Sequence, residues 1–218
     1  MRTLASLILL TLLAPAALAD RAPAPRAPTQ PVAPPPPAIT LAAIDRATVP
    51  EPCKPIAQQA MTANLAAALS ARISLASCMT DRAIAALALC DCGESILAID
   101  AAVAPAIALL DDAIAKADAA TVAIAQHTKG ELYTGFATRL HATLPPPAAG
   151  ASAAEVTLHD LRGQTLEAQL TPWRDTARTA FQQVLDLAQA HPEVTRNPVA
   201  ATALRDSQRR LAADAVSG

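Results

Sequence analysis

Apolar residues recur every three or four positions through most of the chain, and this spacing places them on one face of an α-helix. One such repeat starts at Met61 and continues at Leu65, Leu69 and Ile73. A longer repeat covers residues 107–128, and the charged residues of that segment fall off its apolar stripe. The pattern predicts long amphipathic helices that pack along apolar seams.

Alanine supplies most of the apolar residues. Hydrophobic residues make up 52% of the chain, whereas aromatic residues make up only 2%. Alanine has the highest helix propensity, and the β-branched and aromatic residues that favour strands are sparse. We therefore predict an all-α fold, either an antiparallel helical bundle or a set of helical hairpins. Because alanine-lined faces bury little area per residue, we expect a thin core.

Residues 1–19 have the features of a cleavable signal peptide. Arg2 precedes an apolar run over residues 4–13, and the small-x-small sequence at residues 17–19 is the pattern that signal peptidases accept. Pro15 interrupts the run before it reaches the roughly 20 residues that span a membrane. We therefore expect a periplasmic or secreted protein with no stable membrane span after cleavage.

Two proline-rich stretches divide the rest of the chain. Residues 20–38 are predicted to be a disordered, extended spacer, because each proline fixes φ and removes a backbone donor. Residues 39–144 are predicted to be a helical domain that contains all four cysteines, and a proline-rich linker over residues 145–152 ends it. Residues 153–215 are predicted to be a C-terminal three-helix segment. Whether the two helical parts share one core stays open.

Caps and breakers give the coarse positions of the helices. In the cysteine-containing domain we expect a helix over residues 56–78, a short helix from Thr80 to Gly93, and a long helix over residues 107–128. Pro105 fits either the first turn of this long helix or a kink in a longer helix that begins near Glu94. The apolar face then continues to residue 144. A capping box formed by Ser152 and Glu155 begins the C-terminal segment. Its helices are expected over residues 153–168, 172–188 and 198–211.

The chain has an even number of cysteines, Cys53, Cys78, Cys90 and Cys92. In an exported protein such cysteines are usually disulfide-bonded. On a helix, Cys90 and Cys92 would point roughly 200° apart, so we expect each to pair with Cys53 or Cys78 instead of with the other. The two resulting pairings stay open. Each bond would contribute about 2–4 kcal/mol by restricting the unfolded chain.

The Cys-x-Cys pair at residues 90–92 has a second interpretation. Thiolates bind soft metal ions such as copper(I) or zinc, although no histidine lies at the usual ligand spacing and the nearest one downstream is His127. Structural disulfides are therefore the favoured interpretation. A periplasmic metal-handling or thiol-redox protein is the alternative.

No arrangement of residues matches a known catalytic site. The histidines, His127, His141, His159 and His191, are scattered without HExxH spacing, and the chain has no GxSxG or phosphate-binding glycine loop. We therefore predict neither an enzyme nor a metal site nor a cofactor. The net charge of −2 also argues against nucleic-acid binding.

The aromatic side chains, Tyr133, Phe136, Trp173 and Phe181, are possible partner-binding residues, because rings anchor interfaces. Filling the core is the alternative role for them. We predict that the chain is a binding or scaffold module for an unknown protein or cell-envelope partner. A cluster of Arg205, Arg209 and Arg210 is explained by a solvated face or an acidic partner.

Two resemblances accompany this interpretation. The AxxxF step at Ala177 and Phe181 resembles the second helix of a tetratricopeptide repeat, which implies a helical hairpin with a peptide-binding groove. The segment KGELYTGFATRLHATLPP, with the tryptophan-containing helix and the HPE and NP steps after it, is similar to uncharacterised secreted alanine-rich helical proteins of high-GC bacteria such as myxobacteria. The second resemblance covers about half of the mature chain and implies no activity.

Overall fold

The computed structural model describes residues 39–217, which belong to one compact unit. These residues form seven α-helices and one short 3-10 helix, and none of them forms a strand. The prediction of an all-α fold is therefore confirmed. The predicted signal peptide and spacer, residues 1–19 and 20–38, lie outside the described residues.

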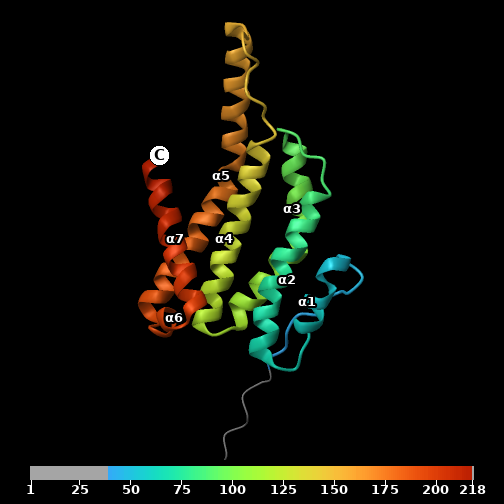
Figure 1. Ribbon diagram of the computed structural model, residues 1–218, viewed down its shortest axis with the longest axis vertical. Coiled ribbons are helices and arrows are strands. Elements are labelled where there is room, and N and C mark those ends of the chain that lie inside the picture. The colour runs from blue at the N-terminus through green and yellow to red at the C-terminus, as the bar shows by residue number, and fades with distance from the viewer. Residues whose placement is uncertain (1–38, 218) are drawn as a thin grey trace, which may run out of the picture. The chain divides into compact units, whose positions relative to one another are not determined.

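Three long helices run up and down in sequence order. These are α2 (Leu65–Ala85), α3 (Gly93–Lys116) and α4 (Ala119–His141), and α3 packs against both of its neighbours (Figure 1). The 3-10 helix η1 (Glu51–Cys53) and the short helix α1 (Lys54–Gln59) lie against α2.

The C-terminal helices pack on the other side of α4. The longest helix, α5 (Ala153–Ala190), lies along α4, and α6 (Glu193–Arg196) leads into α7 (Pro198–Ser217), which contacts α4 and α5 (Figure 1). One apolar cluster combines residues of α3, α4 and α5, among them Ile99, Phe136 and Leu166. The two predicted helical parts of the chain therefore share one core.

Two predicted helices are each divided in the structure. The helix expected over residues 56–78 stops after α1, and Asn64 starts α2 by accepting a hydrogen bond from the Ala67 N–H at 3.1 Å. The helix expected over residues 107–128 breaks after Lys116, the last residue of α3. Asp118 then caps α4 by accepting a hydrogen bond from the Thr121 N–H at 2.9 Å. These predictions are wrong because helix formers flank both caps, so the apolar spacing continues across each break.

Two further boundaries differ from the prediction near residue 90. Thr80, expected as a cap, lies inside α2, which continues to Ala85. Gly93, expected to end a helix, is instead the first residue of α3. The chain between α2 and α3 is therefore not helical, and both cysteines of the Cys-x-Cys pair lie in it.

The predicted break between residues 168 and 172 is also wrong, because α5 continues through Pro172. A proline inside a helix removes a backbone hydrogen bond and kinks the helix, and α5 changes direction near its middle (Figure 1). Leu170 and Trp173, on either side of the proline, are both buried in the core. Packing of the two parts of α5 thus compensates for the lost bond.

A buried ion pair holds the first described residues against α2 and α3. Arg72 is 2% exposed, and its guanidinium donates to Asp112 Oδ2 at 2.8 Å and to the Ala42 carbonyl at 2.6 Å. Lys116 donates to the Thr40 carbonyl at 2.6 Å. Residues 40–42 are therefore tied to the helices by charged side chains.

Candidate functional site

The cysteines pair differently from the expectation that Cys90 and Cys92 each bond to Cys53 or Cys78. One disulfide joins Cys53 to Cys78, with a Cα–Cα distance of 5.9 Å, and the other joins Cys90 to Cys92, at 5.3 Å. The prediction assumed that Cys90 and Cys92 lie on a helix. They instead occupy a non-helical turn between α2 and α3, in which Cys92 has an extended backbone, so the helical separation of their side chains does not apply.

The Cys53–Cys78 bond is part of the core. Cys53 is fully buried at the end of η1, and Cys78 lies half-buried on α2 within the same apolar cluster. The bond therefore clamps the short N-terminal helices to α2.

The Cys90–Cys92 bond lies at the surface, at the N-terminus of α3. Cys90 is exposed, and Cys92 is the N-cap residue of the helix. Ser95, in the first turn of α3 and only 3% exposed, accepts a hydrogen bond from the Cys90 N–H at 2.8 Å. Its hydroxyl oxygen lies 3.2 Å from the sulfur of Cys90 and 3.9 Å from that of Cys92.

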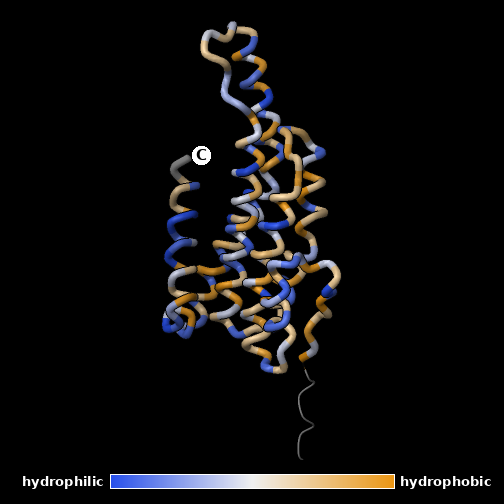
Figure 2. The backbone as a smooth tube through the Cα atoms, turned by 45° about the vertical axis from the view of Figure 1, so that its right-hand side comes forward, coloured by the Kyte–Doolittle hydropathy of each residue, from blue (hydrophilic) through white to orange (hydrophobic). Residues whose placement is uncertain are grey.

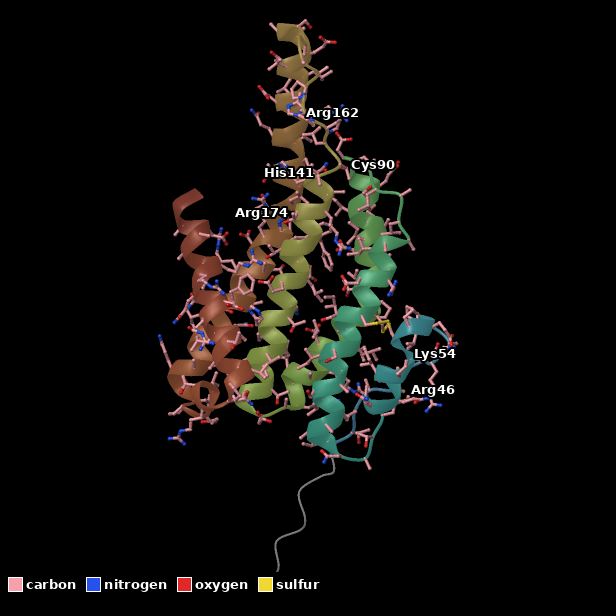
Figure 3. The ribbon with its side chains drawn as sticks, in the orientation of Figure 1. Arg46, Lys54, Cys90, His141, Arg162 and Arg174 are labelled. Atoms are coloured by element: carbon pink, nitrogen blue, oxygen red, sulfur yellow. A yellow bond between two sulfur atoms is a disulfide. The ribbon has the colours of Figure 1, made fainter. Side chains whose placement is uncertain are left out.

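A salt bridge connects this turn to α5. Asp91, between the two cysteines, accepts a hydrogen bond from Arg162 Nε at 2.8 Å, and a second nitrogen of the same guanidinium also contacts it. Figure 3 shows Cys90 and Arg162 at the same end of the helices. The Arg162 charge compensates the aspartate beside the two sulfurs, and the pair fixes the turn relative to α5.

The N-terminus of α3 also affects the chemistry of the turn. Unpaired N–H groups at the start of a helix carry partial positive charge, which favours a nearby anion. A thiolate released from the Cys90–Cys92 bond would form beside these groups, and such a position lowers the pKa of a cysteine thiol. The arrangement therefore suits thiol–disulfide exchange.

The aromatic residues proposed as a docking surface are mostly core residues. Phe136, Trp173 and Phe181 are 1%, 5% and 2% exposed. The Trp173 indole N–H donates a hydrogen bond to Asp100 at 3.0 Å, so the only polar group of the ring has its partner within the protein. The partner-binding prediction is therefore wrong for these three rings, because α4 and α5 bury them between the helices.

Tyr133 is the remaining ring and is only half-buried. It packs edge-on against Phe136, with ring centroids 5.4 Å apart. Burial, followed by the nearby charges of Asp100 and Asp111, raises the pKa of the Tyr133 hydroxyl. This ring thus borders the core and does not form a docking surface with the other three.

A second polar cluster lies between α4 and α7. His127 contacts the buried Ser207 hydroxyl at 3.1 Å through Nδ1, and Arg210 forms two hydrogen bonds to the Glu131 carboxylate at 2.9 and 2.8 Å. Burial lowers the pKa of His127, which Glu131 and Asp206 partly oppose. Sequence reasoning missed this cluster because its members lie about 80 positions apart in the chain.

The arginines of the predicted basic cluster have contacts within the chain. Arg210 pairs with Glu131 of α4, Arg209 pairs with Asp206, and Arg205 donates to Thr202. Within residues 39–217, no group of three or more His, Cys, Asp or Glu side chains is placed to hold a metal ion.

One described helix, α3, is long and apolar enough to cross a membrane by length and composition. In the structure it packs between α2 and α4, with Val103 and Leu110 in the core. The core helix of a folded domain passes the same test.

Comparison with known proteins adds no relative to these observations. No protein-family model, no curated protein and no solved structure matches the chain.

Proposed function

We propose that this chain is an exported helical protein that exchanges a disulfide with partner thiols through Cys90 and Cys92. The observation that carries the proposal is that these two cysteines pair with each other in an exposed turn. Export is proposed on the signal-like residues 1–19, and two disulfides are in keeping with an oxidising compartment.

Loop length separates the roles of the two disulfides. Cys53 and Cys78 are 25 residues apart, whereas Cys90 and Cys92 are 2 apart. In the chain-entropy model, closing the longer loop stabilises the fold by about 3.5 kcal/mol and closing the shorter one by about 1.5 kcal/mol. A purely structural role therefore accounts for the first bond better than for the second.

The accessibility of the sulfur atoms also distinguishes the two disulfides. Exchange requires an attacking thiolate to reach one sulfur of the bond. Cys90 is exposed, whereas Cys53 is fully buried and Cys78 is half-buried against the core cluster. Partner thiols can therefore reach the Cys90–Cys92 bond while the protein stays folded.

Graded redox buffers test the proposal. The folded protein is equilibrated with glutathione at increasing ratios of reduced to oxidised form, free thiols are alkylated, and each cysteine is mapped by mass spectrometry. We expect Cys90 and Cys92 to become free, reversibly, while Cys53 and Cys78 stay bonded. Joint reduction of both bonds, only when the protein unfolds, would refute the proposal.

Stability measurements provide an independent check. The double variant C53A/C78A should lose about 3.5 kcal/mol of unfolding free energy in urea, and C90A/C92A about 1.5 kcal/mol. The second variant should also lose exchange with oxidised glutathione. An equal or larger loss of stability in C90A/C92A would mean that the exposed bond is mainly structural.

A second candidate function, a binding or scaffold module, is favoured by the first part of α5. Val156, Leu158 and Leu161 are 39%, 58% and 54% exposed, and this part of α5 has hydrophobic positions among hydrophilic ones (Figure 2). Leu158 and Leu161, three positions apart, share one face of α5, and contiguous exposed apolar residues mark interaction sites. The partner would be a protein or a cell-envelope component.

Site-specific photo-crosslinking tests this second candidate. A crosslinking residue at Leu158 should give a defined adduct in cells that produce the protein. The same residue at Gln182, an exposed polar position on α5, should not. Equal labelling at the two positions would refute a docking role for this surface.

A further inference from the structure

We infer that Cys90 is the cysteine that forms the mixed disulfide with the partner, that Cys92 is the resolving cysteine, and that Ser95 is a positioning residue for Cys90. This inference rests on the proposed function and assigns roles within the same turn. The partner class is a molecule that supplies two thiols, such as a polypeptide with a pair of cysteines, because reduction of one disulfide consumes two thiols.

Exposure distinguishes the two sulfurs. Cys90 belongs to the exposed residues of the turn, whereas Cys92 is half-buried as the N-cap of α3. Thiol–disulfide exchange proceeds along a line of three sulfurs, so the sulfur that receives the partner must be open to solvent. Cys90 meets this requirement better than Cys92.

The position of the Ser95 hydroxyl is a second difference between the sulfurs of Cys90 and Cys92. Its oxygen accepts the Cys90 N–H at 2.8 Å, and neither sulfur of a disulfide has a hydrogen to donate. The hydroxyl must therefore be the donor in its contact with Cys90 Sγ at 3.2 Å, which is shorter than the 3.9 Å to Cys92 Sγ. A donor held in this place stabilises a thiolate on Cys90, because hydrogen bonds to a charged form favour that form.

The N-terminus of α3 favours a thiolate on Cys92, its N-cap residue, as well as on Cys90, so exposure and the Ser95 hydrogen bond are what distinguish Cys90. Asp91 and Glu94 are the acidic residues next to the sulfurs, and negative charge there disfavours a thiolate. Arg162 of α5 forms a salt bridge with Asp91 and offsets its charge. Glu94 is an exposed first-turn residue of α3, so solvent screens it.

The exchange balances in two steps. A partner thiolate attacks Cys90 Sγ, the Cys90–Cys92 bond breaks, and the Cys92 thiolate leaves and takes up a proton. The second partner thiol loses its proton and attacks the partner sulfur of the mixed disulfide, which releases the Cys90 thiolate, and this thiolate then takes up a proton. The partner is oxidised to a disulfide, and this chain gains two electrons and two protons as a dithiol.

Two single-cysteine variants test the assignment, with oxidised glutathione as the probe. C92A leaves Cys90 free, C90A leaves Cys92 free, and the Cys53–Cys78 bond stays intact in both. A thiol whose pKa is lower by one has tenfold more thiolate. Because that thiolate is less nucleophilic by about threefold, the net increase in reaction rate is about threefold. We therefore expect Cys90 to form the glutathione adduct at least about threefold faster than Cys92, as followed by mass spectrometry.

Ser95 is tested in the C92A background through the ultraviolet absorbance of the thiolate. Ser95→Ala should raise the pKa of the Cys90 thiol by about 1, and Ser95→Thr, which keeps a hydroxyl, should restore it. An unchanged pKa in Ser95→Ala would overturn the positioning role.

The outcomes separate this inference from the proposed function. If Cys92 reacts faster than Cys90, the assignment of roles is overturned while exchange through the pair stands. If the wild-type Cys90–Cys92 bond resists every redox buffer in which the protein stays folded, the proposed function itself is wrong.

Discussion

Replacing Gly130 by alanine tests the packing of α4 against α5. A Cβ atom on Gly130 would lie 2.5 Å from Cε1 of Phe181 and 2.8 Å from both Cδ1 and Cζ of the same ring. Carbon atoms in contact are about 3.5–4.0 Å apart. Because Phe181 is only 2% exposed, the ring has no open space into which it can move.

Two opposing effects set the size of the change. Alanine is favoured over glycine in a helix interior by about 1 kcal/mol. Overpacking a core typically costs about 1–3 kcal/mol, and the upper part of that range applies because three ring atoms would be too close at once. The net expectation for Gly130→Ala is a loss of about 1–2 kcal/mol of unfolding free energy.

Urea denaturation measures this difference, and α4 itself offers a matched control. A Cβ on Gly135 would meet nothing within 4 Å, so Gly135→Ala should stabilise the protein by up to about 1 kcal/mol. In the Gly130→Ala background, F181L should lower the unfolding free energy by less than it does in the wild-type protein, because the smaller side chain relieves the overlap. If Gly130→Ala stabilises the protein as much as Gly135→Ala does, the close packing described for Phe181 is wrong.

Three further predictions follow from other contacts. Asp112→Asn removes the charge that compensates buried Arg72 and should cost about 3–5 kcal/mol in urea; a loss under about 1 kcal/mol, as for exposed pairs, would contradict that burial. Ser152→Ala removes the N-cap of α5 and should cost about 1 kcal/mol in thermal unfolding, whereas an unchanged melting temperature would mean that the cap contributes nothing. Because burial lowers the pKa of His127, its neutral form stabilises the fold above the usual histidine pKa of about 6.5, and this contribution is lost as the pH falls. His127→Gln should therefore flatten the pH dependence of the melting temperature below that value, and an unchanged pH dependence in this variant would contradict the burial of His127.

The sequence by itself determined that the described residues are helical and where some helices end. Apolar spacing and alanine content are local properties, and so are the prolines after α4 and the Ser152–Glu155 capping box, which is present as predicted. Local signals failed at Asn64 and Asp118. Alanine-rich sequence flanks both caps, so nothing in the spacing marks the break.

Tertiary structure decided the features that bear on function. The Cys90–Cys92 pairing depends on the backbone of a turn between α2 and α3, and residue spacing does not reveal that turn. Arg72 and Asp112 lie 40 positions apart and meet only because α2 packs on α3. Phe136 and Trp173 lie in one apolar core because α5 lies along α4. Helix propensity acts between near neighbours in the chain, whereas burial and cysteine pairing depend on which distant residues the fold brings together.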